Sequence, residues 1–236
     1  MHITDAIGLV LIALSAALSF YAQMKVSSTF KKYSTVANRK GHDGADVARQ
    51  ILLLSGITDV NVERVPGNLT DHYDPTSKTL RLSDSVYAST SIAALGVAAH
   101  EAGHAIQHAK SYAPLNMRSS IFPVVNFSSK MSTPLIFAGI LFSSFGGSIG
   151  MMILYTGIIL FIAVVAFQVV TLPVEFDASA RAIRMLQDNN FLTTDEIQPA
   201  RKVLNAAALT YVAAAIVAIA QLIRLILIVL TNRGRD

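Results

Sequence analysis

The sequence of 236 residues contains no cysteine and few charged residues. Without thiols the chain can form neither a disulfide framework nor a thiolate metal site, so any zinc ligands must be His or carboxylate side chains. Charged residues make up 14% of the chain and hydrophobic residues 53%, whereas soluble domains carry roughly 25% charged residues. We also find no internal repeat. The composition therefore argues against a large soluble core and predicts a membrane protein.

The first long apolar run extends from Ile3 to Met24 and is long enough to span a bilayer, which takes about 20 residues. Its flanking cations, Lys25, Lys31 and Lys32, follow the run instead of preceding it. A signal peptide would carry its cations before the apolar run and a small-residue cleavage site after it. We therefore expect a retained anchor.

Two more apolar runs, residues 134–145 and 149–170, predict a transmembrane helical hairpin with a tight, uncharged turn at Gly146-Gly147-Ser148. The preceding stretch 117–130 is either the entry to the first of these spans or an interfacial segment. Its uncertainty comes from Lys130, because a charged side chain is costly at mid-bilayer.

Residues 203–230 form the last long apolar run and predict a fourth span. Arg224 interrupts this run near its end. Its side chain can reach the membrane interface or face the interior of the helix bundle, and we expect the first.

The motif His100-Glu101-Ala102-Gly103-His104 lies in a run of small and apolar residues, Ile92 to Ile106, that predicts a helix. Helical residues four apart share one face, so two imidazoles can converge on one cation. Glu101 projects from almost the same edge and can reach a metal-bound water. This is the zinc-peptidase arrangement, with two His ligands and Glu as general base. The alternative is a buried helix with its His satisfied otherwise, which would also bury Glu101 at a cost.

A catalytic zinc site usually has three protein ligands and a water, so a third ligand is needed. Glu175, which follows Leu172-Pro173 at the start of a polar stretch, is the best candidate; alternatively it is an ordinary solvated helix start, where Glu is favoured anyway. His108 lies one turn beyond His104 and diverges from the metal. With two spans between the motifs, Glu175 returns to the same side of the membrane as His100.

A β-hairpin is predicted close to the metal helix. Residues 69–73 and 79–83 flank the turn-forming stretch 74–78, after a helix over 43–55 and a short strand over 60–65. An exposed strand here can pair with an extended peptide, or it can be purely structural. His72 and Tyr73 on this hairpin are candidates to hold the developing oxyanion.

The distribution of cations predicts the side of the membrane that carries the site. Eight of them lie near span ends on the site's side: Lys25, Lys31, Lys32, Arg118, Arg181, Arg184, Arg201 and Lys202. The other side has mainly Arg233 and Arg235. The positive-inside rule then places the site in the cytoplasm and both termini outside. We interpret the net charge of +4 as a topology signal, and expect no nucleic-acid partner.

Three separated stretches together closely resemble the YugP-type membrane zinc metallopeptidases of bacteria. They are His100-Glu101-x-x-His104, the upstream Leu69-Thr70-Asp71-His72-Tyr73-Asp74-Pro75 and the later Leu172-Pro173-Val174-Glu175-Phe176-Asp177-Ala178-Ser179. They occur in the right order, and the resemblance covers almost the whole chain. It implies a multi-span zinc protease of the bacterial inner (cell) membrane.

The chain is also distantly similar to the heat-shock membrane protease and prenyl-protein endopeptidase group of gluzincins. Those proteins use a Glu-x-x-x-Asp motif for the third ligand. Here Ser179 stands four residues after Glu175, so the supporting carboxylate of that group is missing at this position. Asp177 is a nearby carboxylate, and the sequence leaves open whether it substitutes for the missing supporting carboxylate.

We therefore predict a mainly α, multi-span helical membrane protein with a zincin-like region that carries a small β-hairpin. Its expected segments are an anchor (1–24), a catalytic region (25–118), a transmembrane hairpin (119–171), a third-ligand helix and loop (172–202) and a closing span with tail (203–236). The expected function is a Zn²⁺-dependent endopeptidase acting on membrane or membrane-proximal proteins, with membrane lipids around it. The alternatives are a non-hydrolytic metal-binding or scaffold protein, for which Glu101 has no use, and a hydrolase of a lipid or amide.

Overall fold

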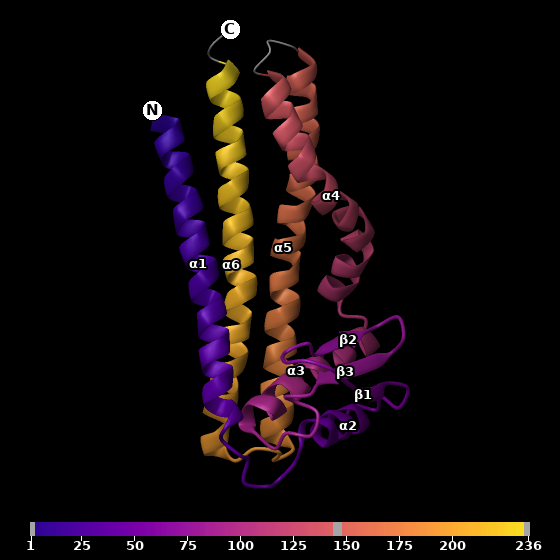
Figure 1. The fold of residues 1–236 in the computed structure, drawn as a ribbon. Helices are drawn as coiled ribbons and strands as arrows, with labels where there is room; N and C mark the ends of the chain where they lie inside the picture. Colours follow the sequence, from indigo (N-terminus) through magenta and orange to yellow (C-terminus); the bar gives the residue numbers. More distant parts are fainter. Residues whose placement is uncertain (1–2, 144–147, 234–236) are drawn as a thin grey trace. The chain divides into compact units, whose positions relative to one another are not determined.

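The computed structural model describes residues 3–143 and 148–233, which form six helices and three strands (Figure 1). Their order is α1 (Ile3–Ser34), α2 (Gly44–Leu54), β1 (Asn61–Val65), β2 (His72–Asp74), β3 (Thr79–Ser83), α3 (Ile92–Ala109), α4 (Ala113–Ser143), α5 (Ser148–Asp188) and α6 (Thr194–Arg233). The chain divides into two compact units. The first unit comprises residues 1–21, 117–172 and 211–236, and the second unit residues 22–116 and 173–210.

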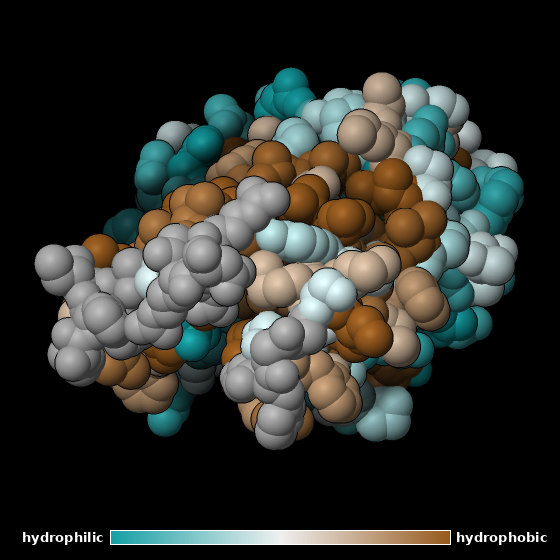
Figure 2. All heavy atoms as spheres, turned by 90° about the horizontal axis from the view of Figure 1, so that it is seen from above, coloured by the Kyte–Doolittle hydropathy of each residue, from teal (hydrophilic) through white to brown (hydrophobic). Residues whose placement is uncertain are grey.

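Four helices are long and apolar enough to cross a membrane: Ala6–Ser34, Ala113–Ser143, Ser148–Asp188 and Thr194–Thr231. Only 11% to 28% of the residues in their most apolar windows are buried inside the protein. Most of their apolar side chains therefore face outward, as they do in a helix surrounded by lipid. Figure 2, which looks onto the helix ends, shows many apolar side chains on the visible face. The predicted mainly helical, four-span membrane protein is confirmed.

Close helix packing in the first unit joins α4 to α5. A Cβ added to Gly139 of α4 would lie 2.5 Å from the backbone nitrogen of Leu154 in α5, so the two backbones meet where only glycine fits. Leu154 and Ile158 are buried here together with Leu225 of α6. In a bilayer such contact between small residues and backbone replaces the hydrophobic drive of a soluble core.

The structure resolves the ambiguous stretch before the hairpin. Residues 117–130 belong to α4, which is continuous from Ala113 despite Pro123 and Pro134 in its interior. Lys130 is exposed on this helix. The predicted turn begins at Gly146-Gly147, which lies outside the described residues.

Arg224 lies against α1. A Cβ on Gly8 would be 3.4 Å from Arg224 Nε, and the guanidinium approaches Gln221 Oε1 at 3.5 Å. The side chain is therefore half-buried beside α1, and the expectation that it reaches the membrane interface stays a prediction. Gln221, one turn away on the same helix, offers the guanidinium a polar neighbour, and Gly8 of α1 leaves room for it.

Helix α5 continues through Pro173 and ends only at Asp188, so the last apolar run of the hairpin and the polar stretch that carries Glu175 lie on one helix. Proline removes one helical hydrogen bond, at a cost of about 3 kcal/mol. Just beyond it, Val174, Ala178 and Ala182 are all fully buried at a four-residue spacing. This buried stripe holds the second part of α5 helical against the core of the second unit.

The second unit contains a three-stranded sheet in the order β1-β3-β2. Strands β2 and β3 are antiparallel, which confirms the predicted hairpin, and β1 adds to the other edge of β3 in parallel. Leu80 and Leu82 of β3 are fully buried and pack with Ile51 of α2 and Leu95 of α3. The sheet therefore has one face on the core and one polar face.

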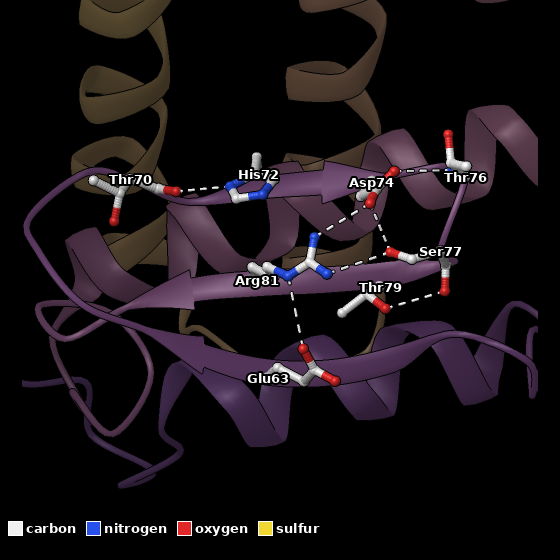
Figure 3. Close-up of polar contacts among 8 residues, drawn as sticks. All are labelled: Glu63, Thr70, His72, Asp74, Thr76, Ser77, Thr79 and Arg81. Carbon is white, nitrogen blue, oxygen red and sulfur yellow. Dashed lines mark hydrogen bonds and ion pairs between the residues drawn. The ribbon is translucent and has the colours of Figure 1, made fainter.

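Figure 3 shows this polar face of the sheet. Arg81 of β3 lies between Asp74 of β2, at 3.3 Å, and Glu63 of β1, at 3.7 Å. One guanidinium thus links all three strands, because side chains on neighbouring strands stand next to each other on this face.

Helix α6 begins with a capping box. The backbone N–H of Thr193 donates to Glu196 Oε2 at 2.8 Å, which satisfies one of the exposed donors of the first turn. The other Glu196 oxygen accepts from the backbone N–H of Arg39 at 2.8 Å. The helix therefore begins at Thr194, and Glu196 also joins it to the loop after α1.

Candidate metal centre

Helix α3 carries the motif and begins at a well-formed cap. Ser91 Oγ accepts a hydrogen bond from the backbone N–H of Ala94 at 3.1 Å, as expected for a serine N-cap. The helix then buries a series of small side chains: Ala94, Ala98, Ala99, Ala102 and Ala105. Small side chains allow neighbouring elements to approach the helix axis closely, which brings the groups of α5 within reach of the motif.

Gly103 sets how closely α3 and α5 approach. A Cβ at this position would lie 2.8 Å from the backbone oxygen of Ala178, a distance that real Cβ atoms essentially never show. The contact lies between the two His of the motif and next to the helix turn that carries Glu175. The glycine inside the motif therefore permits the packing that brings the later carboxylate to the imidazoles.

His100, His104 and Glu175 form one cluster whose potential ligand atoms all lie within 4.8 Å of one another. Glu175 Oε2 is 3.3 Å from His100 Nε2 and 3.6 Å from His104 Nε2. The three side chains are largely buried, with exposed fractions of 13%, 12% and 3%. Two imidazoles and one carboxylate whose ligand atoms converge form a donor set that Zn²⁺ prefers. Such a cluster could hold a metal ion.

The outer nitrogen of each imidazole has a protein partner. His100 Nδ1 lies 3.1 Å from Ser179 Oγ, and His104 Nδ1 lies 3.0 Å from Gln107 Oε1. When Nδ1–H donates to these oxygens, the lone pair of Nε2 is left facing Glu175. Gln107 Oε1 can only accept, so it selects the Nδ1–H tautomer of His104 that a metal needs, and Ser179 Oγ is able to accept from the same tautomer of His100.

Gln107 is the centre of a buried hydrogen-bond network. Its side chain is fully buried, and its Nε2 donates to the backbone oxygen of Val174 and to Asp177 Oδ2, both at 2.8 Å. These two acceptors fix the amide so that Oε1 faces His104. Asp177 in turn accepts from Arg181 Nε at 2.6 Å. One side chain therefore positions a candidate ligand on α3 and fastens α3 to the turn of α5 that bears Glu175.

The pKa of His104 is raised above its ordinary value. Burial alone would lower it, but the hydrogen bond to Glu175 and the negative charges of Glu101 and Glu175 outweigh burial. The surroundings of His104 thus favour positive charge. The same surroundings would favour a cation bound at this point.

Glu101 is 9% exposed on α3, and a second carboxyl group lies close to it. Asp71 accepts hydrogen bonds from the Ser83 backbone N–H at 2.7 Å and the Ser83 hydroxyl at 2.9 Å. Burial raises the pKa of Asp71; the Ser83 hydrogen bonds oppose this, and the negative charge of Glu101 adds to it. The loop before β2 therefore contributes to the electrostatic surroundings of the candidate base.

The two oxyanion candidates on β2 lie on opposite faces of the sheet. His72 is exposed, stands opposite Arg81 and pairs its Nδ1 with the Thr70 backbone oxygen at 2.9 Å (Figure 3). Tyr73 stands opposite the buried Leu80, and its hydroxyl lies 2.8 Å from Nδ1 of His108 on α3. The structure therefore brings Tyr73, and not His72, to the motif helix.

His108 lies outside the candidate metal cluster. The group of side chains that could hold a metal ion among the described residues contains His100, His104 and Glu175 and does not contain His108. Its ring instead lies against Tyr73, with ring centroids 5.8 Å apart. The contact joins α3 to the edge strand β2.

Comparison with known proteins identifies the family. A family described as "Putative neutral zinc metallopeptidase" matches residues 8–230, which is nearly the whole chain. This chain belongs to that family. A zinc peptidase family agrees with a cluster of two His and one Glu. Among curated proteins, this chain is 49% identical over 219 residues to "Putative membrane protease YugP" of Bacillus subtilis (strain 168), covering 93% of this chain and 95% of the relative. No solved structure matches.

Two residues of this candidate site, Gln107 and Ser179, were not predicted from the sequence. Gln107 stands three residues after His104, so helical spacing already placed both on one face, and that signal was available. Ser179 was noted only because it replaces a carboxylate, yet its hydroxyl is the partner of His100. Its role depends on the meeting of α3 with α5, which spacing along the chain does not give.

Proposed function

We propose that this protein is a membrane zinc endopeptidase in which His100, His104 and Glu175 hold the metal and Glu101 is the general base. The convergence of the three side chains within 4.8 Å is the observation that carries this proposal. The family of zinc peptidases and the relative called a membrane protease support it. Its substrates are peptide bonds of membrane or membrane-proximal proteins.

Zn²⁺, when bound, supplies a Lewis acid that makes a water acidic and polarises the scissile carbonyl. Glu101 accepts the proton of the attacking water and delivers it to the leaving amine. Burial of Glu101 at 9% exposure keeps bulk water from competing for that proton. Ser179 and Gln107 hold the imidazole rings while the reaction proceeds.

Tyr73 is our candidate for stabilising the oxyanion. When Nδ1–H of His108 on the motif helix donates to the Tyr73 hydroxyl oxygen, the Tyr73 O–H is free to donate a hydrogen bond to developing negative charge. Its strand, β2, is an edge of the three-stranded sheet, so an extended substrate can add to it as a further strand. Tyr73 then stands where the substrate backbone would pass.

We further propose that the site faces the cytoplasm from the bacterial cell membrane. The cations near the span ends of the site's side favour this orientation by the positive-inside rule. Two candidate spans, α4 and α5, separate α3 from the turn that carries Glu175. An even number of crossings returns both halves of the site to one side.

Two single substitutions test the roles separately. In detergent-purified protein we expect Glu101→Gln to keep about one zinc per chain and to lose turnover of a quenched fluorescent peptide library by roughly 10²- to 10⁴-fold. Glu175→Ala should lose zinc as well as turnover, as measured by elemental analysis. Glu63→Gln, on the exposed strand β1, is the matched control and should change neither.

The outcomes separate the alternatives. Full turnover in Glu101→Gln would remove Glu101 as the base, and unchanged zinc in Glu175→Ala would remove Glu175 as a ligand. Wild-type protein that binds no metal after zinc is added back would overturn the peptidase and favour a scaffold.

A further inference from the structure

A groove of about 600 Å³ lies in the second unit, between the end of α1 and the start of α6. It shares no residue with the candidate metal centre. Its lining includes Lys25 and Lys32 of α1 and Lys202 of α6. Two helices far apart in the sequence thus bring three ammonium groups around one hollow.

The charge of this groove is of one sign. Its lining contains three Lys and neither Asp nor Glu. Among the ion pairs of the described residues, none involves these lysines. Lys32 instead lies 5.4 Å from the centre of the Tyr33 ring. Unneutralised cations around a concave surface focus a positive potential and attract an anion.

The wall of the groove offers neutral hydrogen-bond donors beside the cations. Thr29 and Asn205 line it, and the hydrogen bonds of the described residues include none from either side chain. A hydroxyl and an amide complement the oxygens of a phosphate, which accept several donors at once. Ala206 and Leu209 add an apolar part to the lining. The chemistry fits an anionic headgroup that has an apolar body attached.

The position along the chain selects a lipid over a soluble anion. Lys25 directly follows the apolar run that ends at Met24, inside the candidate span helix Ala6–Ser34. A basic pocket at a span end lies at the depth of the phosphates, where anionic lipids attract Lys by about 1 kcal/mol each. Lys31 and Arg201 adjoin two of these lysines in sequence and do not line the groove. Cations that only set the orientation of the spans can lie on any face of a helix, whereas these three lysines share the face that lines the groove.

We propose that this groove is a binding site for the phosphate headgroup of an anionic phospholipid. Lys25, Lys32 and Lys202 neutralise the phosphate, and Thr29 and Asn205 donate to its oxygens. The site is separate from catalysis and ties the two helices of the second unit to the membrane surface.

The test compares two pairs of substitutions on the same helices with the same change in charge. Lys32→Gln with Lys202→Gln removes cations that line the groove; Lys31→Gln with Arg201→Gln removes their sequence neighbours. Delipidated full-length protein is titrated with dioleoyl phosphatidylglycerol, dioleoyl phosphatidylcholine or inorganic phosphate. Bound lipid is counted by native mass spectrometry, and the melting temperature without lipid checks folding.

We expect wild type and the neighbour pair to bind phosphatidylglycerol and not phosphatidylcholine. The groove pair should bind phosphatidylglycerol on the order of 30-fold more weakly, from two lysines. Equal weakening in both pairs would overturn the proposal, because it would show a bulk charge effect. Equal binding of phosphatidylcholine would overturn it too. Binding of inorganic phosphate as tight as that of the lipid would also overturn it, because it would show a site for a soluble anion. If the groove pair fails to fold, Asn205→Leu is the substitute and must give the same selective loss.

Discussion

Glutamine 107 shows how much of the candidate site depends on a single uncharged side chain. It bonds to His104 on its own helix and to Val174 and Asp177 on α5. Substitution of a residue that orients a metal ligand commonly costs 10- to 100-fold in metal affinity or activity. A buried amide that leaves its partners unpaired also weakens the fold.

We expect Gln107→Ala to lower zinc affinity about 10- to 100-fold, as measured by competition with a chromogenic chelator. The exposed Gln50→Ala on α2 is the control and should leave the affinity at the wild-type level. Gln107→Glu keeps an acceptor for His104 but sets a carboxylate oxygen against the Val174 oxygen and the Asp177 carboxylate, so it should not recover the loss. An unchanged affinity in Gln107→Ala would mean that His104 needs no orienting partner.

At this scale the sequence predicts what is local. The spacing of His100, Glu101 and His104 is sufficient to propose ligands and base, because helical geometry alone brings them together. The partners of Gln107 are 67 and 70 residues away, and only packing between α3 and α5 brings them close. The positions of His72 and Tyr73 on opposite faces follow from strand alternation, but which face meets α3 depends on the sheet.

Among the elements, α3 and α5 form the contact that matters most. Gly103→Ala should push the helices apart, because its Cβ would lie 2.8 Å from the Ala178 backbone oxygen. Overpacking of this kind costs about 1 to 3 kcal/mol. We expect a lower melting temperature by circular dichroism together with weaker zinc binding.

The same helix supplies the control. A Cβ at Gly96 would meet Ala200 at an ordinary 3.8 Å, so Gly96→Ala should be neutral or stabilise by up to about 1 kcal/mol. If both substitutions lower zinc binding equally, helix propensity and not close approach decides the effect.

The hairpin β2–β3 should respond to acid. Hydrogen bonds from the Ser77 hydroxyl and the Thr76 backbone N–H lower the pKa of Asp74 to about 2, whereas the unfolded chain binds this proton near pH 3.9. The unfolded state therefore binds more protons between these values. The contribution of Asp74 to stability is complete above about pH 4 and is lost as the pH falls towards 2.

In zinc-free protein we expect Asp74→Asn to lower the melting temperature at pH 6 and to have little effect at pH 2, measured by calorimetry. Thr58→Ala, an exposed substitution that changes no titratable group, should act equally at both pH values. The same decrease for Asp74→Asn at both pH values would contradict the role of its ionised form.

Elements were predicted best where their signals are local. The turn of the hairpin carries turn-forming residues and is found where it was predicted, between β2 and β3, although β2 begins at His72 and not at Leu69. The continuity of α5 through Pro173 was not predictable, because the cost of proline is offset by burial of Val174, Ala178 and Ala182. The pairing of β1 with β3 in parallel likewise depends on long-range packing.

For the whole molecule, the absence of cysteine makes the orientation directly measurable. We expect Thr58→Cys, exposed in the second unit, to react with a membrane-impermeant maleimide only after cells are opened. Ser148→Cys, exposed at the start of α5, should react in intact cells. The reverse pattern would place the site outside the cytoplasm.

The four-span architecture was predictable from apolar run lengths, and it required Glu175 to return to the side of His100. The meeting of the two halves in one cluster agrees with that count of crossings. The groove between α1 and α6 was not foreseen, because the lysines that line it and the cations beside them look alike in the sequence.

Division of the cluster between α3 and α5 also sets when the candidate metal cluster can form during synthesis. A ribosome makes both His of the motif first, and Glu175 only after α4 and the apolar part of α5 have been made. The nascent chain therefore has only two of the three side chains of the cluster until the second and third candidate spans have been made. If the proposed function holds, a chain that stalls before this point has no complete metal site, so synthesis itself delays the activity until these spans are in place.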